Sequence, residues 1–335
     1  MDRCGEAEVI YMWGGFLLFV VIVLAVDLGV FNRDDHQPSG REALSFTAVT
    51  VALALCFAVF AFQAYNHHWQ GLGLSPDSID GRTNDGHLAI VKFLTGYFVE
   101  LGLSMDNVLV IALIFAHLRV PSKYQHRVLY WGILGAIGMR GAMIAGGTAL
   151  VSRYHWMTYV FGGFLVLTSA NMLLTKEKEE LPEERWIVRR LSRRCRVAKE
   201  YHGQRFSIVR DGKRWITPLA VALVIIETTD LLFAVDSIPA IFAITTDPFL
   251  VFTSNVFAIL CLRSLYFGLA GLIEKFQYLN VSLAVILGLV GAKMLAPSAV
   301  DRALGESQNI VTLAAVFAIL LAGAGISAMA GRKAR

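Results

Sequence analysis

Nine apolar runs, each about twenty residues long or longer, constrain this chain more than any other feature of its sequence. They lie at residues 9–30, 42–65, 90–117, 127–151, 156–175, 217–243, 251–273, 278–297 and 309–329. A run of this length can cross the hydrocarbon core of a bilayer as a helix. The first run is too long for a signal-peptide core and lacks a small-residue cleavage site, so we expect it to be retained. Since 56% of the 335 residues are hydrophobic, we expect an all-α polytopic membrane protein with about nine transmembrane helices.

The distribution of Lys and Arg predicts how these helices are oriented. If Arg127, at the edge of the fourth run, is counted with the third loop, the odd-numbered loops and the C-terminal tail carry 22 of the 30 basic residues. The N-terminal end and the even-numbered loops carry four, and four lie inside spans. Because basic residues accumulate on the cytoplasmic side, we expect the N-terminus outside and the C-terminus in the cytoplasm. The net charge of +4 follows from this asymmetry, so we expect the lipid bilayer as a partner and no nucleic acid.

The longest segment between spans is the basic cytoplasmic loop at 176–216, which holds 13 basic and 7 acidic residues. Its first half predicts an amphipathic helix that begins near Pro182. Its second half predicts a β-hairpin, because Asp211 and Gly212 suit a tight turn and the flanking residues alternate. The composition does not distinguish a regulatory segment from a simple connector.

Polar residues repeat across two groups of three spans, at 90–175 and 217–297. In each group an acidic first span is followed by an Arg in the second span and by Asn or Lys before Met-Leu in the third. Glu100 and Arg140 are 40 residues apart, and Glu227 and Arg263 are 36 residues apart. The next polar residues, Asn171 and Lys293, follow after 31 and 30 residues. Three is an odd number, so the second group must enter the membrane in the opposite direction. We therefore expect an inverted three-helix repeat, an architecture of many secondary transporters.

Five carboxylates lie inside the third and sixth predicted spans, where ionised groups are costly unless they meet a cation or water. They are Glu100 and Asp106 in the third span, and Glu227, Asp230 and Asp236 in the sixth. The basic residues considered as their partners are Arg140, Arg263 and Lys293. Five acids against three bases leave two negative charges, which one divalent cation or two protons would balance. The alternative is a set of buried ion pairs that only orders the bundle.

Helical spacing groups some of these polar side chains on common faces. Glu227 and Asp230 are three residues apart and share a face. Glu100, Ser104 and Asn107 share another face, at spacings of four and three residues.

Asp106 and Asp236 point away from these faces in regular helices. A local break beside Gly102 or Pro239 would turn them inward and free backbone carbonyls as ligands. Carboxylate, amide and hydroxyl oxygens suit hard divalent ions such as Mn²⁺, Mg²⁺ or Ca²⁺.

Two stretches, "VELGLSMDNVLVIALIF" and "IETTDLLFAVDSIPAIFAITTDPFLVFTSNVFAILCLRSLYF", closely resemble the TerC family of bacterial membrane proteins, and the similarity runs from about residue 90 to 297. The resemblance implies a multi-pass protein of the bacterial cytoplasmic (inner) membrane, from a family linked to manganese efflux and tellurite resistance. The residues that match its two acidic motifs are Glu100, Asp106, Asn107, Glu227, Asp230, Asp236 and Ser237.

Together these features predict that residues 1–335 form a single transmembrane transporter domain that exports Mn²⁺ by alternating access, with protons as a plausible coupling ion. The expected metal ligands are Glu100, Asp106, Asn107, Glu227, Asp230 and Asp236. The expected supporting residues are Ser104, Ser237, Arg140, Arg263 and Lys293. The sequence does not separate Mn²⁺ from Mg²⁺ or Ca²⁺, and it does not fix the oligomeric state.

Two other functions remain as alternatives at this point. A membrane scaffold or assembly factor would confer tellurite resistance through partners that dock on the basic loop. An intramembrane enzyme is disfavoured, because neither acidic motif has the Gly-x-Gly-Asp context of an aspartyl protease and the chain has no H-E-x-x-H. We therefore expect no enzymatic activity.

Overall fold

A computed structural model describes residues 3–31, 40–154, 156–174, 196–198, 200–210, 212–269 and 277–333. Long helices coincide with all nine predicted runs. These are α1 Arg3–Phe31, α2 Gly40–Asn66, α3 Gly86–His117, α4 Ser122–Arg153, α5 Trp156–Leu174, α7 Pro218–Phe242, α8 Pro248–Leu269, α9 Gln277–Leu295 and α11 Gln308–Lys333. Seven helical stretches in the described part are long and apolar enough to cross a membrane, and α1 and α9 hold shorter apolar stretches. The prediction of an all-α polytopic membrane protein is therefore confirmed.

Several short elements complete the chain. The predicted hairpin is confirmed: β1 Ser207–Arg210 pairs antiparallel with β2 Lys213–Ile216. Gly212 supplies the positive φ of +67° that the turn requires. The helix predicted near Pro182 lies outside the described residues. The short helices η1 Trp69–Gly71, α10 Pro297–Leu304 and η3 Gly305–Ser307 were not predicted.

Capping residues fix where the two acidic helices begin. The Asp85 side chain accepts a hydrogen bond from the Leu88 amide at 2.7 Å, which caps α3. Thr217 caps α7 in the same way, and Pro218 takes the first helical position, where its missing N–H costs nothing. These caps set the helical phase of the acidic side chains further along each helix.

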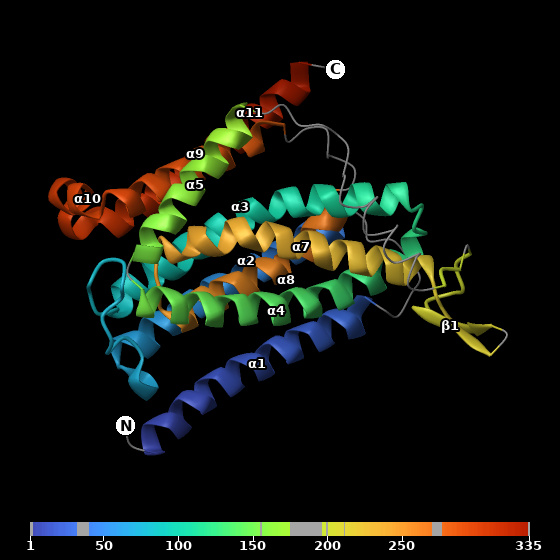
Figure 1. Cartoon of the computed structure of the whole chain (residues 1–335), viewed down its shortest axis with the longest axis horizontal. Helices are drawn as coiled ribbons and strands as arrows, with labels where there is room; N and C mark the ends of the chain where they lie inside the picture. Colours follow the sequence, from blue (N-terminus) through green and yellow to red (C-terminus); the bar gives the residue numbers. More distant parts are fainter. Residues whose placement is uncertain are drawn as a thin grey trace.

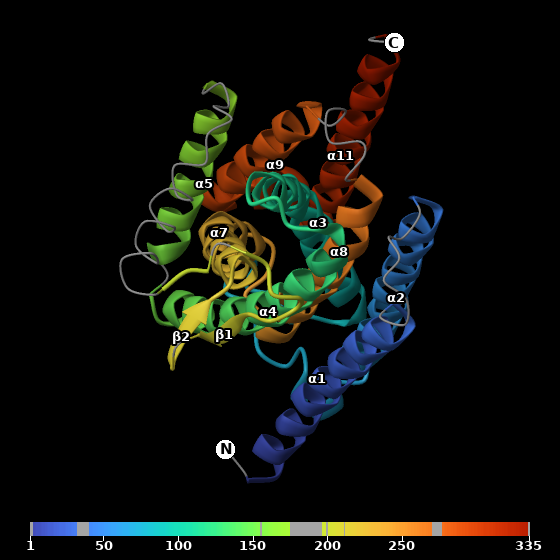
Figure 2. The same ribbon diagram turned by 90° about the vertical axis from the view of Figure 1, so that its right-hand side faces the viewer.

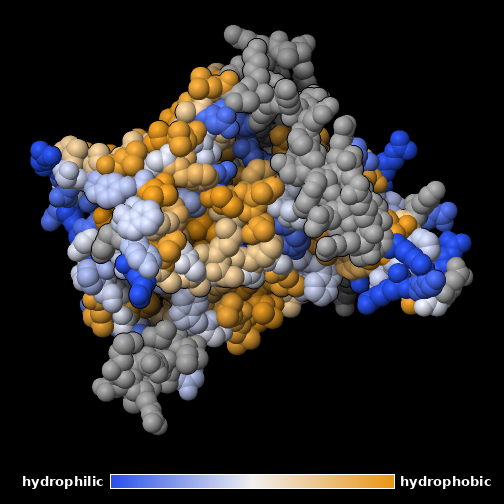
Figure 3. All heavy atoms as spheres, in the orientation of Figure 1, coloured by the Kyte–Doolittle hydropathy of each residue, from blue (hydrophilic) through white to orange (hydrophobic). Residues whose placement is uncertain are grey.

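Four helices, α3, α4, α7 and α8, form the centre of the bundle (Figures 1 and 2). The innermost is α8, which is almost wholly buried and packs against α2, α3 and α4. In contrast, α1, α2, α5 and α11 expose many large apolar side chains. Hydrophobic residues cover the middle of the face in Figure 3, and hydrophilic residues gather at its two ends. This distribution is typical of a bundle whose outer helices face lipid.

The helices of the two predicted repeat units pack in a regular pattern. α3 packs on α8 and α4 on α7, while α5 packs on α9. α3 also packs on α7, and Figure 1 shows that these two helices run in opposite directions.

The two ends of the bundle differ in structure. We call the end that carries residues 196–216 and the α3–α4 connection the hairpin end, and the end that carries residues 67–85, the α7–α8 connection and α10 the loop end (Figure 1). At the hairpin end, the Tyr201 hydroxyl donates to the Leu118 carbonyl at 2.8 Å, which holds the hairpin segment over the α3–α4 connection.

Candidate functional site

The guanidinium of Arg140, on α4, lies at the centre of the bundle and is almost fully buried. It forms an ion pair with Glu100 of α3. It also binds Asp230 of α7 through two hydrogen bonds, Nη2 to Oδ1 at 3.0 Å and Nε to Oδ2 at 3.3 Å. One basic side chain therefore joins carboxylates from two helices that belong to different predicted repeat units.

Neutral side chains complete the surroundings of Arg140. Its Nη1 donates to Asn255 Oδ1 at 2.9 Å and to Ser237 Oγ at 3.4 Å. Asn107 Nδ2 donates to Asp230 Oδ1 at 3.4 Å. The sequence analysis missed Asn255, although a polar residue in the apolar α8 was the available signal. We call Arg140, Glu100, Asp230, Asn107, Ser104, Glu227, Ser237 and Asn255 the central cluster.

Several oxygen atoms of the central cluster are left without hydrogen bonds. Glu100 Oε2, Ser104 Oγ and Asn107 Oδ1 on α3, and Glu227 Oε2 on α7, are buried and have no hydrogen-bond partner among the described residues. Buried polar atoms are normally paired, and each unpaired one costs about 1–3 kcal/mol. The predicted α3 face of Glu100, Ser104 and Asn107 thus presents three oxygens that a ligand or water could bind.

The carboxylate of Glu227 depends on a glycine of the neighbouring helix. A Cβ atom at Gly135 of α4 would overlap both carboxylate oxygens of Glu227. Gly135 therefore lets the charged end of Glu227 approach α4 where any larger residue would displace it.

A cavity of about 40 Å³ adjoins the cluster and is lined by Asn107, Asp230 and Arg263, together with apolar residues of α3, α4, α7 and α8. Since one water molecule needs a cavity volume of at least about 10–15 Å³, this cavity has room for a few waters. Arg263 lies toward the C-terminal end of α8 and its Nη2 contacts His126 Nδ1 at 3.2 Å, near the start of α4. The cavity therefore extends from the central cluster toward the hairpin end.

Asp106 and Asp236 do not have the positions that the predicted helix breaks would give them. Both α3 and α7 are continuous, and Pro239 lies within the last turn of α7. Asp236 faces α5, where Thr168 Oγ1 donates to it at 3.4 Å. In an unbroken α3, Asp106 lies about 100° or more around the helix from Glu100 and Asn107. The structure shows neither of the local helix breaks that would turn these two acids inward, because α3 and α7 stay helical at Gly102 and Pro239.

Lys293 also lies apart from the central cluster. Its ammonium donates to Asn309 Oδ1 at 3.2 Å and to Thr312 Oγ1 at 3.4 Å, both on α11. The structure thus gives the Lys293 ammonium hydrogen-bond acceptors on α11. The central cluster contains three carboxylates, of Glu100, Asp230 and Glu227, and the guanidinium of Arg140.

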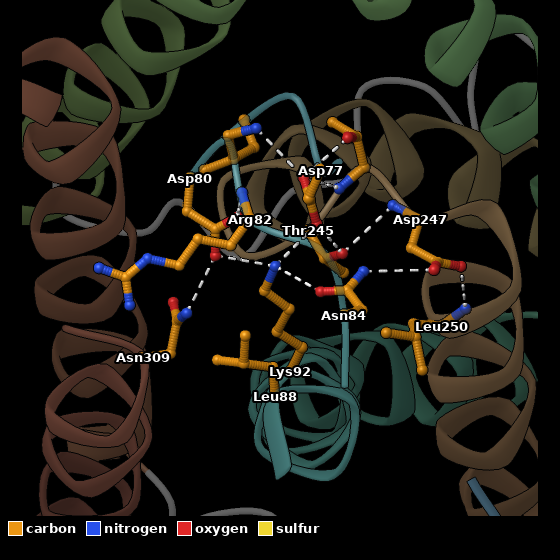
Figure 4. A network of polar contacts seen from close by, with 12 residues as sticks. Asp77, Asp80, Arg82, Asn84, Leu88, Lys92, Thr245, Asp247, Leu250 and Asn309 are labelled. Carbon is orange, nitrogen blue, oxygen red and sulfur yellow. Dashed lines mark hydrogen bonds and ion pairs between the residues drawn. The ribbon is translucent and has the colours of Figure 1, made fainter. Parts of the chain in front are cut away.

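A second polar cluster lies at the loop end (Figure 4). Lys92 of α3 donates to Asp77 Oδ2 at 2.9 Å and to Asn84 Oδ1 at 2.7 Å, and it pairs with Asp80 Oδ2 at 2.8 Å. The members of this loop-end network are Asp77, Asp80, Asn84, Lys92, Thr245, Thr246, Asp247 and Asn309. It ties residues 77–84 to α3, α11 and the α7–α8 connection. Sequence analysis missed it because its acids lie in loops, outside the predicted spans.

Two aspartates of this network have shifted pKa values in opposite directions. Burial acts to raise the pKa of Asp77, but the Lys92 ammonium and the Thr245 hydroxyl outweigh burial and hold the pKa below its usual range. Burial raises the pKa of Asp247. The network therefore favours the charged form of Asp77 and the neutral form of Asp247.

Within the described residues, no three His, Cys, Asp or Glu side chains are grouped so that they could hold a metal ion as they stand. In the central cluster, Arg140 occupies the carboxylates of Glu100 and Asp230 instead. A cation could use these two carboxylates only if Arg140 released them.

The chain is similar in sequence to several bacterial proteins that are described as membrane proteins. An "Uncharacterized membrane protein STKORF319" from Myxococcus xanthus is 46% identical over 84% of this chain and 82% of its own length. A "Putative membrane-bound redox modulator Alx" from Escherichia coli K12 is 41% identical over 85% of both chains. No solved structure matches the chain. The model of the "Integral membrane protein TerC family" matches residues 85–335, so this chain belongs to the TerC family of integral membrane proteins.

Proposed function

We propose that this protein carries a hard divalent cation, with Mn²⁺ as the first candidate, out of the cytoplasm by alternating access. The observation that carries the proposal is the composition of the central cluster, which holds three carboxylates against one guanidinium, with several buried oxygens unpartnered. If all four groups are ionised, the cluster is short of two positive charges. One divalent cation would neutralise it and bind the unpartnered oxygens.

The proposed ligands are oxygen atoms of Glu100, Ser104, Asn107, Glu227 and Asp230. Carboxylate, amide and hydroxyl oxygens favour Mn²⁺, Mg²⁺ and Ca²⁺ over soft metals. Asp106 and Asp236, on other faces of the same two helices, stay outside this cage. Closely spaced carboxylates also exchange a metal for protons, which supports proton coupling.

The packing of the bundle supports the inverted repeat and hence alternating access. Exchanging α3 with α7, α4 with α8 and α5 with α9 converts the α3–α8 contact into the α7–α4 contact and leaves the α5–α9 contact unchanged. Glu100 and Asp230 then come from the first helix of each unit. Transporters of this type place their ion sites between such units, near the middle of the bilayer.

The difference between the two ends supports a direction. The central cavity extends toward the hairpin end. A cavity of about 140 Å³ at the loop end, lined by residues that include Ser78, Lys293 and Gln308, is not lined by any residue of the central cluster. Basic residues concentrate in the loops at the hairpin end, which is cytoplasmic by the positive-inside rule. We therefore propose that the ion enters from the cytoplasm, at the hairpin end.

Mn²⁺ uptake into inverted membrane vesicles tests the proposal. We expect Glu100→Gln and Asp230→Asn to reduce uptake at least tenfold, which corresponds to about 1.4 kcal/mol. Glu306→Gln, at an exposed position in η3, should leave uptake unchanged. Undiminished uptake in both cluster variants would exclude the proposal. The same assay with Mg²⁺ and Ca²⁺ as competitors identifies the preferred ion, and a vesicle pH indicator tests proton exchange.

The name of the Alx relatives raises the question of a redox role. Of the cysteines whose side chains the structure describes, Cys56 is exposed on α2 and Cys261 is buried in α8, and both are free thiols. The unpartnered carboxylate oxygens lie instead in the central cluster, so we base the proposed function on the carboxylates.

A further inference from the structure

Asn255, in the middle of α8, is a buried polar residue outside the proposed ligand set. Its Oδ1 accepts from Arg140 Nη1 at 2.9 Å, a shorter hydrogen bond than either of those between Arg140 and Asp230. Its Nδ2 donates to the Val251 carbonyl at 3.5 Å, which orients the amide. Because α8 is the innermost helix, the amide oxygen is held in a fixed place beside the guanidinium.

A cation in the central cluster creates a difficulty for Arg140. The guanidinium remains charged in proteins, and in this structure its Nη1 pairs with Glu100 while its Nη2 and Nε bind Asp230. If both carboxylates turn to the cation, Arg140 becomes a buried charge without a counter-ion. Such a charge is strongly destabilising unless another acceptor holds it.

We propose that Asn255 is a positioning residue that holds Arg140 while Glu100 and Asp230 bind the transported cation. This inference rests on the proposed function. The amide oxygen suits the task because it attracts a guanidinium less strongly than a carboxylate does. Arg140 can therefore return to Glu100 and Asp230 when the cation leaves.

The shape of the central cavity supports this role. Asp230 and Asn107 line the cavity, whereas Asn255 and Ser237 are not among its described lining residues. Asn255 therefore holds Arg140 away from the side on which Asp230 meets the cavity. Asp230 can turn toward an incoming ion while Arg140 keeps its hydrogen bond to α8.

Titration of the purified protein in detergent with Mn²⁺ tests the inference through two substitutions of Asn255. Asn255→Leu keeps the size and removes the acceptor. In this variant, Arg140 still binds the carboxylates of Glu100 and Asp230 when no cation is present, but it has neither carboxylate when the cation is bound. The cation-bound state is therefore the one destabilised, and we expect Mn²⁺ to bind about tenfold more weakly. A tenfold change corresponds to about 1.4 kcal/mol, within the range of a hydrogen bond to a charged group.

Asn255→Asp should have the opposite effect on binding. The new carboxylate holds the released Arg140 more firmly, so we expect Mn²⁺ to bind at least as tightly as to the wild type. Turnover in inverted vesicles should fall severalfold, because Arg140 returns to Glu100 and Asp230 less readily. Opposite changes in Kd are not expected if Asn255 only fills space.

Controls separate this inference from the proposed function. Thr253→Val, at a buried position of α8 whose hydroxyl bonds to the Phe249 carbonyl, should leave the Kd unchanged. In an Arg140→Gln background, Asn255→Leu should leave the Kd for Mn²⁺ unchanged. Equal weakening by both Asn255 substitutions, or no change with Asn255→Leu, would overturn the inference alone. Failure of the wild type to bind Mn²⁺ would overturn the proposed function, and this inference with it.

Discussion

The central cluster and the loop-end network both surround a basic side chain with acids, yet they differ in how completely their polar atoms are bonded. Lys92 has three oxygen partners within 2.9 Å, and Asp77 accepts further hydrogen bonds from Thr245 and Thr246. Around Arg140, oxygens of Glu100, Ser104 and Asn107 remain unpartnered among the described residues.

This difference separates a structural connection from a site that can exchange its ligand. A fully bonded buried network stabilises one arrangement, since removing any member leaves another charge uncompensated. A cluster with unpartnered oxygens already bears the energetic cost of burying polar atoms without hydrogen bonds. A ligand that binds those oxygens stabilises the folded protein. Substitutions at the loop end should therefore lower the free energy of unfolding, and added Mn²⁺ should not restore it. Substitutions in the central cluster should change how much Mn²⁺ raises the Tm.

Replacing Lys92 should have the largest effect on stability. Lys92→Met leaves Asp77 and Asp80 buried without their cation, and we expect a loss of about 3–5 kcal/mol in the free energy of unfolding. Denaturant unfolding in detergent measures the loss, with exposed Lys213→Met as the matched control. Added Mn²⁺ should not recover it. A loss below about 1 kcal/mol would show that the loop-end network is as weak as a surface ion pair.

Replacing Arg140 should produce a similar loss that Mn²⁺ does restore. Arg140→Gln leaves Glu100 and Asp230 without their guanidinium, so the cation-free protein should be destabilised by up to a few kcal/mol. The same change removes the competitor for Mn²⁺. At about 100 times its Kd, Mn²⁺ contributes about 2.7 kcal/mol, and thermal shift should show a larger Mn²⁺-dependent rise in Tm than in the wild type. An equal or smaller rise would mean that Arg140 does not compete with the ion.

Two glycines of α4 provide a matched pair for the steric role of Gly135. Gly135→Ala places a methyl group against the Glu227 carboxylate. We expect a loss of about 1–3 kcal/mol in stability, as for overpacking, and a severalfold drop in Mn²⁺ uptake. Gly138 has open space at the corresponding position, so Gly138→Ala should leave uptake unchanged and stabilise the helix by up to about 1 kcal/mol. Equal uptake by the two variants would remove Glu227 from the proposed site.

Sequence analysis predicted much of the fold because its signals are local. The length of each apolar run sets a helix, and Asp211–Gly212 sets the turn of the hairpin. The shared faces of Glu100 with Asn107, and of Glu227 with Asp230, follow from helical spacing alone. These predictions need no knowledge of which helices touch.

The partners of Lys92, Lys293 and Asn255 could not be predicted in this way. Lys92 meets Asp77 and Asp80 because residues 67–85 fold back over the start of α3, which depends on tertiary packing. Lys293 resembled a partner for the central acids by its position in the repeat, but α11 supplies its hydrogen-bond acceptors. Asn255 lacked a charge, so the count of acids and bases did not include it.

The smallest predicted effect is a change in how stability depends on pH at the loop end. The pKa of Asp77 is lowered in the folded protein, so its stabilising contribution is complete above about pH 4, the unfolded value, and is lost as pH falls through the folded pKa. The pKa of Asp247 is raised, so its contribution is present below about pH 4 and is lost as pH rises through the folded pKa.

Melting temperatures of Asp77→Asn and Asp247→Asn, measured between about pH 3 and pH 7, test these opposite signs. Relative to the wild type, Asp77→Asn should lose less stability as pH falls below about 4, and Asp247→Asn should lose less as pH rises above about 4. Substitutions in the central cluster should leave this difference unchanged, since its residues are not in the loop-end network. If both variants kept the wild-type pH profile, the loop-end network would not shift the pKa values of Asp77 and Asp247 in opposite directions. The contrast between the fully bonded network and the central cluster would then lose its electrostatic basis.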